Sequence, residues 1–330
     1  MSIPIRLGTR RSALAQAQSG HVAAALEQVT GRPVELVPIV SEGDTNRASL
    51  SVIGGQGVFA TRLREALVAG ECDFLVHSLK DLPTEIPEGL TIAATPPRED
   101  ARDVAITRTG SPLNALAIGA RVGTGSPRRI AQVRRRAPRA EVVDIRGNVD
   151  SRLARVESGE LDAVILAAAG LSRLGSETAL RREELGLAEW PTAPGQGSLA
   201  VETRSDAPAE LLAALAQLDD EATRLAVTVE RGILEGLDAG CQAPMAAHAV
   251  VDGTSVRIRT VVYAPDGSDR IGLDVTESLN RGYIHLNGSG NGADAADGAN
   301  PMHDAREIGL SVARRLLEQG AAGLVSREQS

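Results

Sequence analysis

Short apolar runs alternate with longer amphipathic stretches over the first two thirds of the chain. Apolar runs bounded by turn residues are typical of buried strands, and apolar residues spaced three or four apart are typical of helices. Strands are predicted at residues 3–8, 34–40, 74–76, 104–107, 141–145 and 163–167, and helices at residues 12–29, 59–69, 127–136 and 149–157. This alternation predicts parallel sheets with helices on their faces.

Two proline-containing segments, residues 94–97 and 191–195, mark the points where the chain passes between two such α/β blocks. Two covalent crossings are typical of hinged domains with a cleft between them. We therefore predict two doubly wound α/β domains that resemble periplasmic-binding-protein lobes. The first comprises residues 1–97, completed by a return segment at about 196–217, and the second comprises residues 98–195.

The last third of the chain has a different pattern. Helices are predicted at residues 209–218, 223–237 and 304–319, and antiparallel strands at residues 256–262 and 271–275. A small C-terminal α+β domain is therefore predicted over residues 218–330. Within it, residues 287–300 are rich in Gly, Asn, Ala and Asp without periodicity, which favours a disordered surface loop over a functional flap.

The composition is typical of a globular protein of the cytoplasm. Its 330 residues suit two or three domains, and 42% hydrophobic with 24% charged residues is ordinary for a soluble chain. No apolar run approaches the roughly 18 to 20 residues of a membrane helix, and residues 1–6 lack the apolar stretch of a secretory signal. Cys72 and Cys241 form no disulfide framework, which favours a reducing compartment.

Charge and aromatic content argue against nucleic acid as a partner. The formal net charge is −8, and the 2% of aromatic residues offers few surfaces on which bases can stack. The five histidines show no metal-ligand spacing, so no metal site is predicted. We expect His77 to pack or orient beside the cleft, and Cys72 to be buried as a small apolar residue.

Lysine occurs once in the chain, at position 80, and the remaining 34 of the 35 basic residues are arginine. Lys80 follows an apolar strand, at the place where α/β sheets present residues to a ligand, and Asp81 comes directly after it. A lysine is a compact point charge, whereas an arginine is a broad planar fork. Lys80 therefore indicates a tight anion site, unless it is a chance survivor in an arginine-rich composition.

Arginines also stand at three predicted junctions between a strand and a helix, at residues 8–12, 123–129 and 145–152. The second junction has a capping Ser126 and then Pro127, which together are typical of a helix start. Arg128 and Arg129 follow, although the positive end of a helix favours acidic residues. Such a cluster suits a bound anion with several carboxylates or phosphates.

Two further loops are candidates for a functional role: the glycine-rich residues 54–57 and the loop that contains Cys241. There is no GxxxxGK[ST] phosphate loop, and residues 54–57 (Gly-Gly-Gln-Gly) are interpreted as a mobile lid. Cys241 lies in a predicted loop between a helix and the strands of the small domain. A loop cysteine is either incidental or a covalent attachment point facing a cleft, and the residues themselves leave both readings open.

Taken together, six stretches of the chain resemble one family, the porphobilinogen deaminases, also called hydroxymethylbilane synthases. They are residues 7–12 (Leu-Gly-Thr-Arg-Arg-Ser), 76–83 (Val-His-Ser-Leu-Lys-Asp-Leu-Pro), 123–129 (Gly-Thr-Gly-Ser-Pro-Arg-Arg), 146–148 (Arg-Gly-Asn), 193–197 (Ala-Pro-Gly-Gln-Gly) and 240–244 (Gly-Cys-Gln-Ala-Pro). Each stretch is specific, and they occur in the order found in the family.

The resemblance implies a monomeric, three-domain enzyme of tetrapyrrole (haem) biosynthesis. Such enzymes join four porphobilinogen molecules head to tail with release of ammonia, and water then frees hydroxymethylbilane. By the same resemblance, Cys241 carries a covalent dipyrromethane cofactor through a thioether, and Asp81 is the catalytic carboxylate. The residues implied to bind substrate and cofactor are Arg10, Ser12, Gln18, Ser78, Lys80, Thr124, Ser126, Arg128, Arg129, Arg146, Gly147, Arg152, Arg173 and Gln196.

The chain departs from the family pattern in two places. Gln56 stands where the family often has Lys in the lid, and residues 287–300 look like an insertion. Two rival functions also suit the arginine junctions: a non-catalytic hinged binder of a small polyanion, and an enzyme acting on phosphate esters. The non-catalytic binder does not explain Cys241 in its motif.

Overall fold

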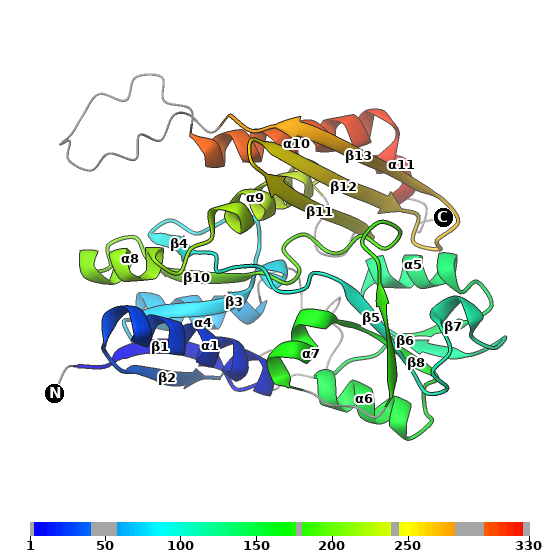
Figure 1. The fold of residues 1–330 in the computed structure, drawn as a ribbon, viewed down its shortest axis with the longest axis horizontal. Helices are drawn as coiled ribbons and strands as arrows, with labels where there is room; N and C mark the ends of the chain where they lie inside the picture. The colour runs from blue at the N-terminus through cyan, green and yellow to red at the C-terminus, as the bar shows by residue number, and fades with distance from the viewer. Residues whose placement is uncertain (1–2, 41–57, 176–179, 239–243, 281–299, 326–330) are drawn as a thin grey trace.

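The chain folds around three β-sheets, each covered by helices (Figure 1). A computed structural model describes residues 3–40, 58–175, 180–238, 244–280 and 300–325. Strands and helices alternate through the first two sheets, and the third sheet follows them as a separate antiparallel unit.

The first sheet has the strand order β2-β1-β3-β10-β4. Its strands are β1 (Ile5–Arg10), β2 (Val34–Ile39), β3 (Phe74–Ser78), β4 (Leu90–Ala94) and β10 (Leu199–Arg204). Its helices are α1 (Ala13–Thr30), α4 (Val58–Val68) and α8 (Ala209–Ala216). Helices α1 and α8 cover one face through Leu26 and Leu215, and α4 covers the other through Leu63 and Leu67. Burial on both faces explains the apolar run Phe74–Val76 in the central strand β3.

The second sheet repeats this architecture with the strand order β7-β6-β8-β5-β9. Its strands are β5 (Asp103–Thr107), β6 (Arg121–Gly123), β7 (Glu141–Val143), β8 (Ala163–Ala167) and β9 (Arg181–Leu185). Its helices are α5 (Pro127–Arg136), α6 (Val149–Glu157) and α7 (Ala168–Leu174). Helix α5 covers one face through Val133, and α6 and α7 cover the other through Leu153 and Leu171. The α/β class predicted from the sequence is confirmed.

Neither sheet is wholly parallel, and this corrects the prediction of parallel sheets. Strand β5 runs antiparallel to β8 and β9, and β10 runs antiparallel to β3 and β4. Each of these strands directly follows a crossing between the sheets. The first residues after the crossings, Asp103 and Leu199, pair with Ala167 and Ser78, the last residues of β8 and β3. Each crossing therefore brings the chain to the carboxyl ends of the parallel strands. The strand that begins there extends toward their amino ends, and so it is antiparallel to them.

The third sheet has three antiparallel strands, β11 (Met245–Asp252), β12 (Ser255–Tyr263) and β13 (Arg270–Ser278). Its helices are α9 (Glu221–Gly236), α10 (Pro301–Glu318) and α11 (Ala321–Val325). Helices α9 and α10 lie side by side against the sheet (Figure 1). They meet at Gly232 and Gly309, where a Cβ on either glycine would overlap the backbone of the other helix. This confirms the small α+β unit; most of residues 287–300 lie outside the described part of the chain.

The predicted helix starts near the candidate site are confirmed by their caps. The Ser12 hydroxyl accepts a hydrogen bond from the Ala15 backbone N–H at 3.3 Å, and helix α1 ends at Gly31 in the left-handed conformation. The Ser126 hydroxyl accepts from the Arg129 backbone N–H at 3.5 Å, with Pro127 opening helix α5. Each cap satisfies a backbone donor that the helix itself leaves unpaired.

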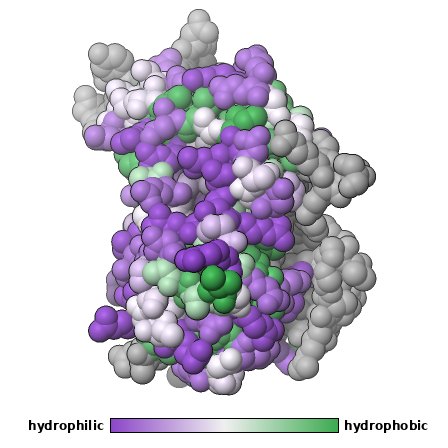
Figure 2. Space-filling view, turned by 90° about the vertical axis from the view of Figure 1, so that its right-hand side faces the viewer, coloured by the Kyte–Doolittle hydropathy of each residue, from purple (hydrophilic) through white to green (hydrophobic). Residues whose placement is uncertain are grey.

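The surface on the side of the second sheet is mostly hydrophilic, with scattered apolar residues (Figure 2). Among the helices that the structure describes, none is both long and apolar enough to cross a membrane.

Candidate active site

Many of the predicted site residues that the structure describes lie at or just after the carboxyl ends of parallel strands in both large sheets. In the first sheet, Arg10 ends β1, and Ser78 ends β3. A single 3-10 turn, η1 (Leu79–Asp81), then carries Lys80 and Asp81, of which Lys80 is half-buried and Asp81 is exposed. In the second sheet, the loops after β6 and β7 lead into helices α5 and α6, which begin beside the remaining arginines.

A hydrogen bond joins Gln18, on the helix that covers the first sheet, to Ser78 at the end of a strand of that sheet. The buried Gln18 side chain on α1 donates from Nε2 to the Ser78 hydroxyl at 2.9 Å. This bond ties helix α1 to the end of β3, immediately before Lys80. Gln18 and Ser78, two predicted members of one site, are therefore in direct contact.

Arg128 and Arg129 are buried, with 4% and 7% of their surfaces exposed, and both are paired with Asp103. Arg128 Nη1 lies 2.9 Å from Asp103 Oδ2, and Arg129 Nη2 lies 2.6 Å from Asp103 Oδ1. These two cations hold the pKa of Asp103 well below its ordinary value, despite the burial that opposes it. The Nε atoms of both arginines are buried without a hydrogen-bond partner among the described residues.

Lys80 is linked to this cluster through Gln196. Lys80 Nζ lies 3.5 Å from Gln196 Oε1, and Gln196 Nε2 donates to Asp103 Oδ1 at 2.8 Å. Burial lowers the pKa of Lys80 to about 8, against the opposing attraction of Asp81 and with a further lowering by Arg129. Lys80 thus belongs to one connected polar cluster that spans both large sheets.

The loop and helix that follow β7 hold three predicted residues. Arg146 is exposed, whereas Arg152 is half-buried and donates from Nε to the Gly147 carbonyl at 2.9 Å. Gly147 has a φ of 113°, and a Cβ at this position would overlap the Ser151 hydroxyl, so the turn requires glycine. Burial lowers the pKa of Arg152 to about 10, and the positive charges of Arg129 and Arg146 lower it further.

The remaining predicted residues have structural contacts of their own. The buried Thr124 hydroxyl accepts from the Ser126 backbone N–H at 3.3 Å, in the turn that begins α5. Arg173 on α7 donates from Nη2 to the Gly197 carbonyl at 2.7 Å, and burial lowers its pKa. Arg173 is therefore held against the second crossing beside Gln196. Cys241 and the lid residue Gln56 lie outside the described residues.

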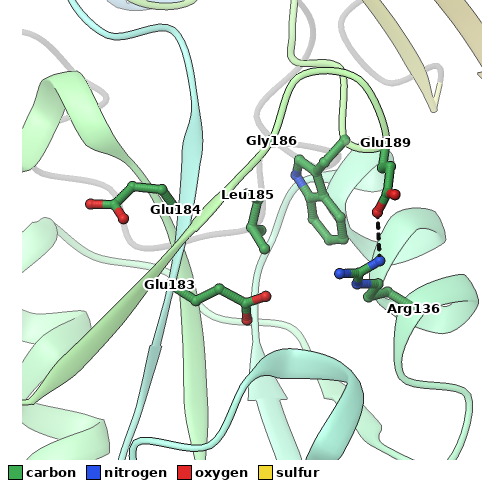
Figure 3. A pocket seen from close by; sticks show the side chains of 7 residues that line it. Arg136, Glu183, Glu184, Leu185, Gly186 and Glu189 are labelled. Atoms are coloured by element: carbon green, nitrogen blue, oxygen red, sulfur yellow. Dashed lines mark hydrogen bonds and ion pairs between the residues drawn. The ribbon is translucent and has the colours of Figure 1, made fainter.

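A small cavity elsewhere in the second sheet does not belong to this site (Figure 3). It has a volume of about 50 Å³, and an Arg136–Glu189 ion pair of 2.7 Å lies along its edge. Ligand pockets commonly have volumes of about 300 to 1,000 Å³. The cavity therefore has room for water and not for a multi-carboxylate ligand.

Sequence reasoning missed Asp103 and Trp190. Asp103 is the first residue of β5, and the buried Trp190 donates from Nε1 to Asp103 Oδ2 at 2.9 Å. Asp103 is an acidic residue that opens a run of apolar strand residues, and Trp190 is the only tryptophan in the sequence. These two features indicate that both residues are buried. No pattern in the sequence predicts that Asp103 pairs with arginines about 25 positions later.

His77 and Cys72 have the structural roles predicted for them. His77 is buried, and its Nε2 lies 3.1 Å from Glu202 Oε2. Cys72 is fully buried next to Gly8, and burial raises the pKa of its thiol to about 11. Within the described ranges, no group of three or more His, Cys, Asp or Glu side chains is placed to hold a metal ion.

Two β-sheets, each covered by helices, carry arginines and a lysine at the carboxyl ends of their strands, and this arrangement is typical of α/β proteins with an anionic ligand. The chain belongs to the porphobilinogen deaminase family. Residues 5–211 match the family description "Porphobilinogen deaminase, dipyromethane cofactor binding domain", and residues 224–318 match "Porphobilinogen deaminase, C-terminal domain".

Relatives of similar length are found in bacteria. The chain is 50% identical to porphobilinogen deaminase 1 of Streptomyces coelicolor over 97% of both chains. It is 44% identical to porphobilinogen deaminase of Mycobacterium bovis, over 97% of this chain and 98% of the relative. Among solved structures, an ancestral cationic amino acid solute binding protein is 16% identical, with a TM-score of 0.40 over 65% of this chain and 87% of that protein.

Proposed function

We propose that this chain is a transferase of tetrapyrrole (haem) biosynthesis that condenses four porphobilinogen molecules into hydroxymethylbilane, with release of ammonia. The observation that carries this proposal is the cluster of Arg128, Arg129 and Lys80 in a chain of the porphobilinogen deaminase family. Each pyrrole ring of such a chain carries an acetate and a propionate. A polycarboxylate of this kind suits arginines, which bind carboxylates in two-point, orienting pairs.

The described residues fit a covalent dipyrromethane, which we propose is attached to Cys241 through a thioether. The buried Nε–H groups of Arg128 and Arg129 have no acceptor within the described part of the chain, so a ligand carboxylate would satisfy them. The mutual repulsion of Arg152, Arg129 and Arg146 would also be relieved by a bound anion. When bound, the dipyrromethane supplies the nucleophilic pyrrole carbon on which chain growth starts.

We propose the following roles for the other site residues. Arg10, Arg146, Arg152 and Arg173 bind ring carboxylates, and Lys80 binds a substrate carboxylate as a compact point charge. The remaining residues proposed to bind substrate or cofactor are Ser12, Gln18, Ser78, Thr124, Ser126, Gly147 and Gln196. Asp81, exposed at the end of its turn, is the catalytic carboxylate.

In this proposal, the Asp81 carboxylate stabilises the positive charge that develops on the substrate as ammonia leaves porphobilinogen. A carboxylate fixed beside a developing cation lowers the barrier to its formation and accepts or returns a proton nearby. The neighbouring Lys80 holds the carboxylate of the incoming ring, so the reacting carbon lies within reach of Asp81. Because Lys80 and Asp81 share one rigid 3-10 turn, their spacing is fixed by the backbone.

We also propose three domains, comprising residues 1–97 with 196–217, residues 98–195 and residues 218–330. Each proposed domain contains one of the three sheets. The protein is proposed to act as a monomer in the cytoplasm, without a nucleic-acid or membrane partner.

The mass of the intact protein tests the proposal directly. Wild-type protein should carry the added mass of two pyrrole units and should convert porphobilinogen to hydroxymethylbilane. Cys241→Ser should lack both properties, whereas Cys72→Ser, at a fully buried thiol, should keep both. An unmodified, inactive wild-type chain would instead favour a non-catalytic binder of polyanions.

A further inference from the structure

Asp103 lies where three segments of the chain meet. It follows the first crossing between the large sheets, at residues 95–102, and opens strand β5. Helix α5 reaches it through Arg128 and Arg129, and the second crossing, residues 186–198, reaches it through Trp190 and Gln196. The Asp103 side chain is fully buried at this meeting point.

Both carboxylate oxygens of Asp103 have two hydrogen-bond donors. Oδ1 accepts from Arg129 Nη2 at 2.6 Å and from Gln196 Nε2 at 2.8 Å. Oδ2 accepts from Arg128 Nη1 and from Trp190 Nε1, both at 2.9 Å. Because these donors occupy one end of each guanidinium, the Nε edges of the two arginines are left for another acceptor. Asp103 thereby selects which edge of each arginine is available to a ligand.

The same carboxylate sets the orientation of Gln196. The Gln196 amide nitrogen has two hydrogens, and they are donated to the Ala101 carbonyl at 2.8 Å and to Asp103 Oδ1. Its carbonyl oxygen is therefore turned toward Lys80 Nζ, 3.5 Å away. Without an acceptor at position 103, the amide nitrogen would keep only its bond to the Ala101 carbonyl, and the Gln196 side chain would be held less firmly.

The charges around Lys80 also point to Asp103. The titratable and charged groups that act on Lys80 are Asp81 from its own turn, Arg128 and Arg129 from α5, and Asp103 from β5. Asp103 is the only acidic group in this set that comes from the second sheet, and one side chain, Gln196, bridges it to Lys80. Its negative charge offsets one of the two arginines and so permits a third cation nearby.

We propose that Asp103 is a positioning residue for the reaction: it orients the Arg128 and Arg129 forks and the Gln196 amide, and its charge keeps Lys80 protonated to bind a substrate carboxylate. This inference rests on the proposed function. Asp103 does not itself bind the substrate or donate a proton in this proposal, because each of its carboxylate oxygens already accepts hydrogen bonds from two protein donors.

A single lysine makes the test direct. In protein labelled with ¹³C-lysine, Lys80 gives the only lysine signal, and its pH titration reports its own protonation without any substrate. Asp103→Asn should weaken proton binding by Lys80 about tenfold, because an attractive charge is lost. It should also raise KM for porphobilinogen at least about tenfold, because one or more charged hydrogen bonds are lost.

Glu202→Gln provides the matched control. Glu202 is equally buried and pairs with Arg64 at 2.8 Å and with His77, but it lies on the α4 side of the first sheet. This variant should lose stability while it keeps the Lys80 titration and KM of the wild type. Equal changes in both variants, or an unchanged Lys80 titration in Asp103→Asn, would overturn the proposal.

Asp103→Glu gives a second test if the Asn variant does not fold. It keeps the charge but displaces the oxygens, so the Lys80 titration should stay near that of the wild type while KM rises. A wild-type KM in Asp103→Glu would overturn the positioning role. Failure of the proposed function itself is distinguished in the wild type, by the absence of a dipyrrole adduct and of hydroxymethylbilane.

Discussion

Arg98 and the fully buried Glu230 form a largely buried ion pair in which the guanidinium donates to both carboxylate oxygens, at 2.6 and 3.2 Å. Arg98 lies on the first crossing between the large sheets, and Glu230 lies on helix α9 of the C-terminal unit. Glu230 also accepts from the backbone N–H groups of Gly195, on the second crossing, and Ala249, on β11. One carboxylate therefore connects both crossings to the third sheet.

Glu230→Gln should destabilise the protein by about 3 to 5 kcal/mol, because it leaves a buried Arg98 charge without its counterion. The midpoint of urea unfolding measures the loss. Glu235→Gln on the same helix is the control, since Glu235 pairs with Arg306 at the surface, where an ion pair contributes at most about 1 kcal/mol. Similar midpoints for the two variants would contradict the connecting role of Glu230.

Asp81→Asn should lower turnover by roughly a hundredfold or more, because a fixed charge beside a developing cation commonly contributes about 3 to 4 kcal/mol. Asp81 is exposed, so the unfolding midpoint and the dipyrrole mass should stay those of the wild type. Asp81→Glu should retain part of the activity because the charge survives. Full turnover by the Asn variant, measured as hydroxymethylbilane formed, would exclude Asp81 as the catalytic carboxylate.

The affinity for porphobilinogen should fall as the pH rises through about 8. The pKa of Lys80 is lowered to about 8, so its ammonium is charged below this pH and neutral above it. A neutral amine does not attract a carboxylate, and KM should increase accordingly. Lys80→Arg should bind more weakly at pH 7, because the fork is too broad, but should lose this alkaline rise in KM. A Lys80→Arg enzyme with the wild-type KM and pH profile would show that the single lysine is an accident of composition.

Arg146→Leu should weaken substrate binding by roughly one to two orders of magnitude, because a charged hydrogen bond contributes about 1.5 to 3 kcal/mol. Arg146 is exposed, so its loss should leave the fold intact. Chain growth should stall at defined lengths, and the trapped intermediates can be separated by charge on an anion-exchange column. Arg155→Leu is the control on the following helix, where Arg155 pairs with Glu160 near the surface. Normal elongation in Arg146→Leu would remove Arg146 from the site.

Local signals in the sequence were enough to predict most of the helices that the structure describes. Ser12 and Gly31 delimit α1, and Ser126 with Pro127 begins α5, because caps depend on residues a few positions apart. Several short elements were missed, including α7 and strands β4, β6, β9 and β10. Strands of three to six residues give too little periodicity for prediction, and β9, with the sequence Arg-Arg-Glu-Glu-Leu, resembles an exposed helix.

The placing of arginines, one lysine and an adjacent aspartate at the ends of strands could be predicted without coordinates, because each motif lies next to its strand along the chain. Which of these charges meet could not be predicted, because it depends on the folded arrangement of the two large sheets. The tertiary structure placed Asp103 between Arg128 and Arg129, turned Gln196 toward Lys80, and reversed β5 and β10 after the crossings. Charge pairing and strand direction depend on segments that are distant in sequence, whose approach is fixed by the packing of whole sheets and helices.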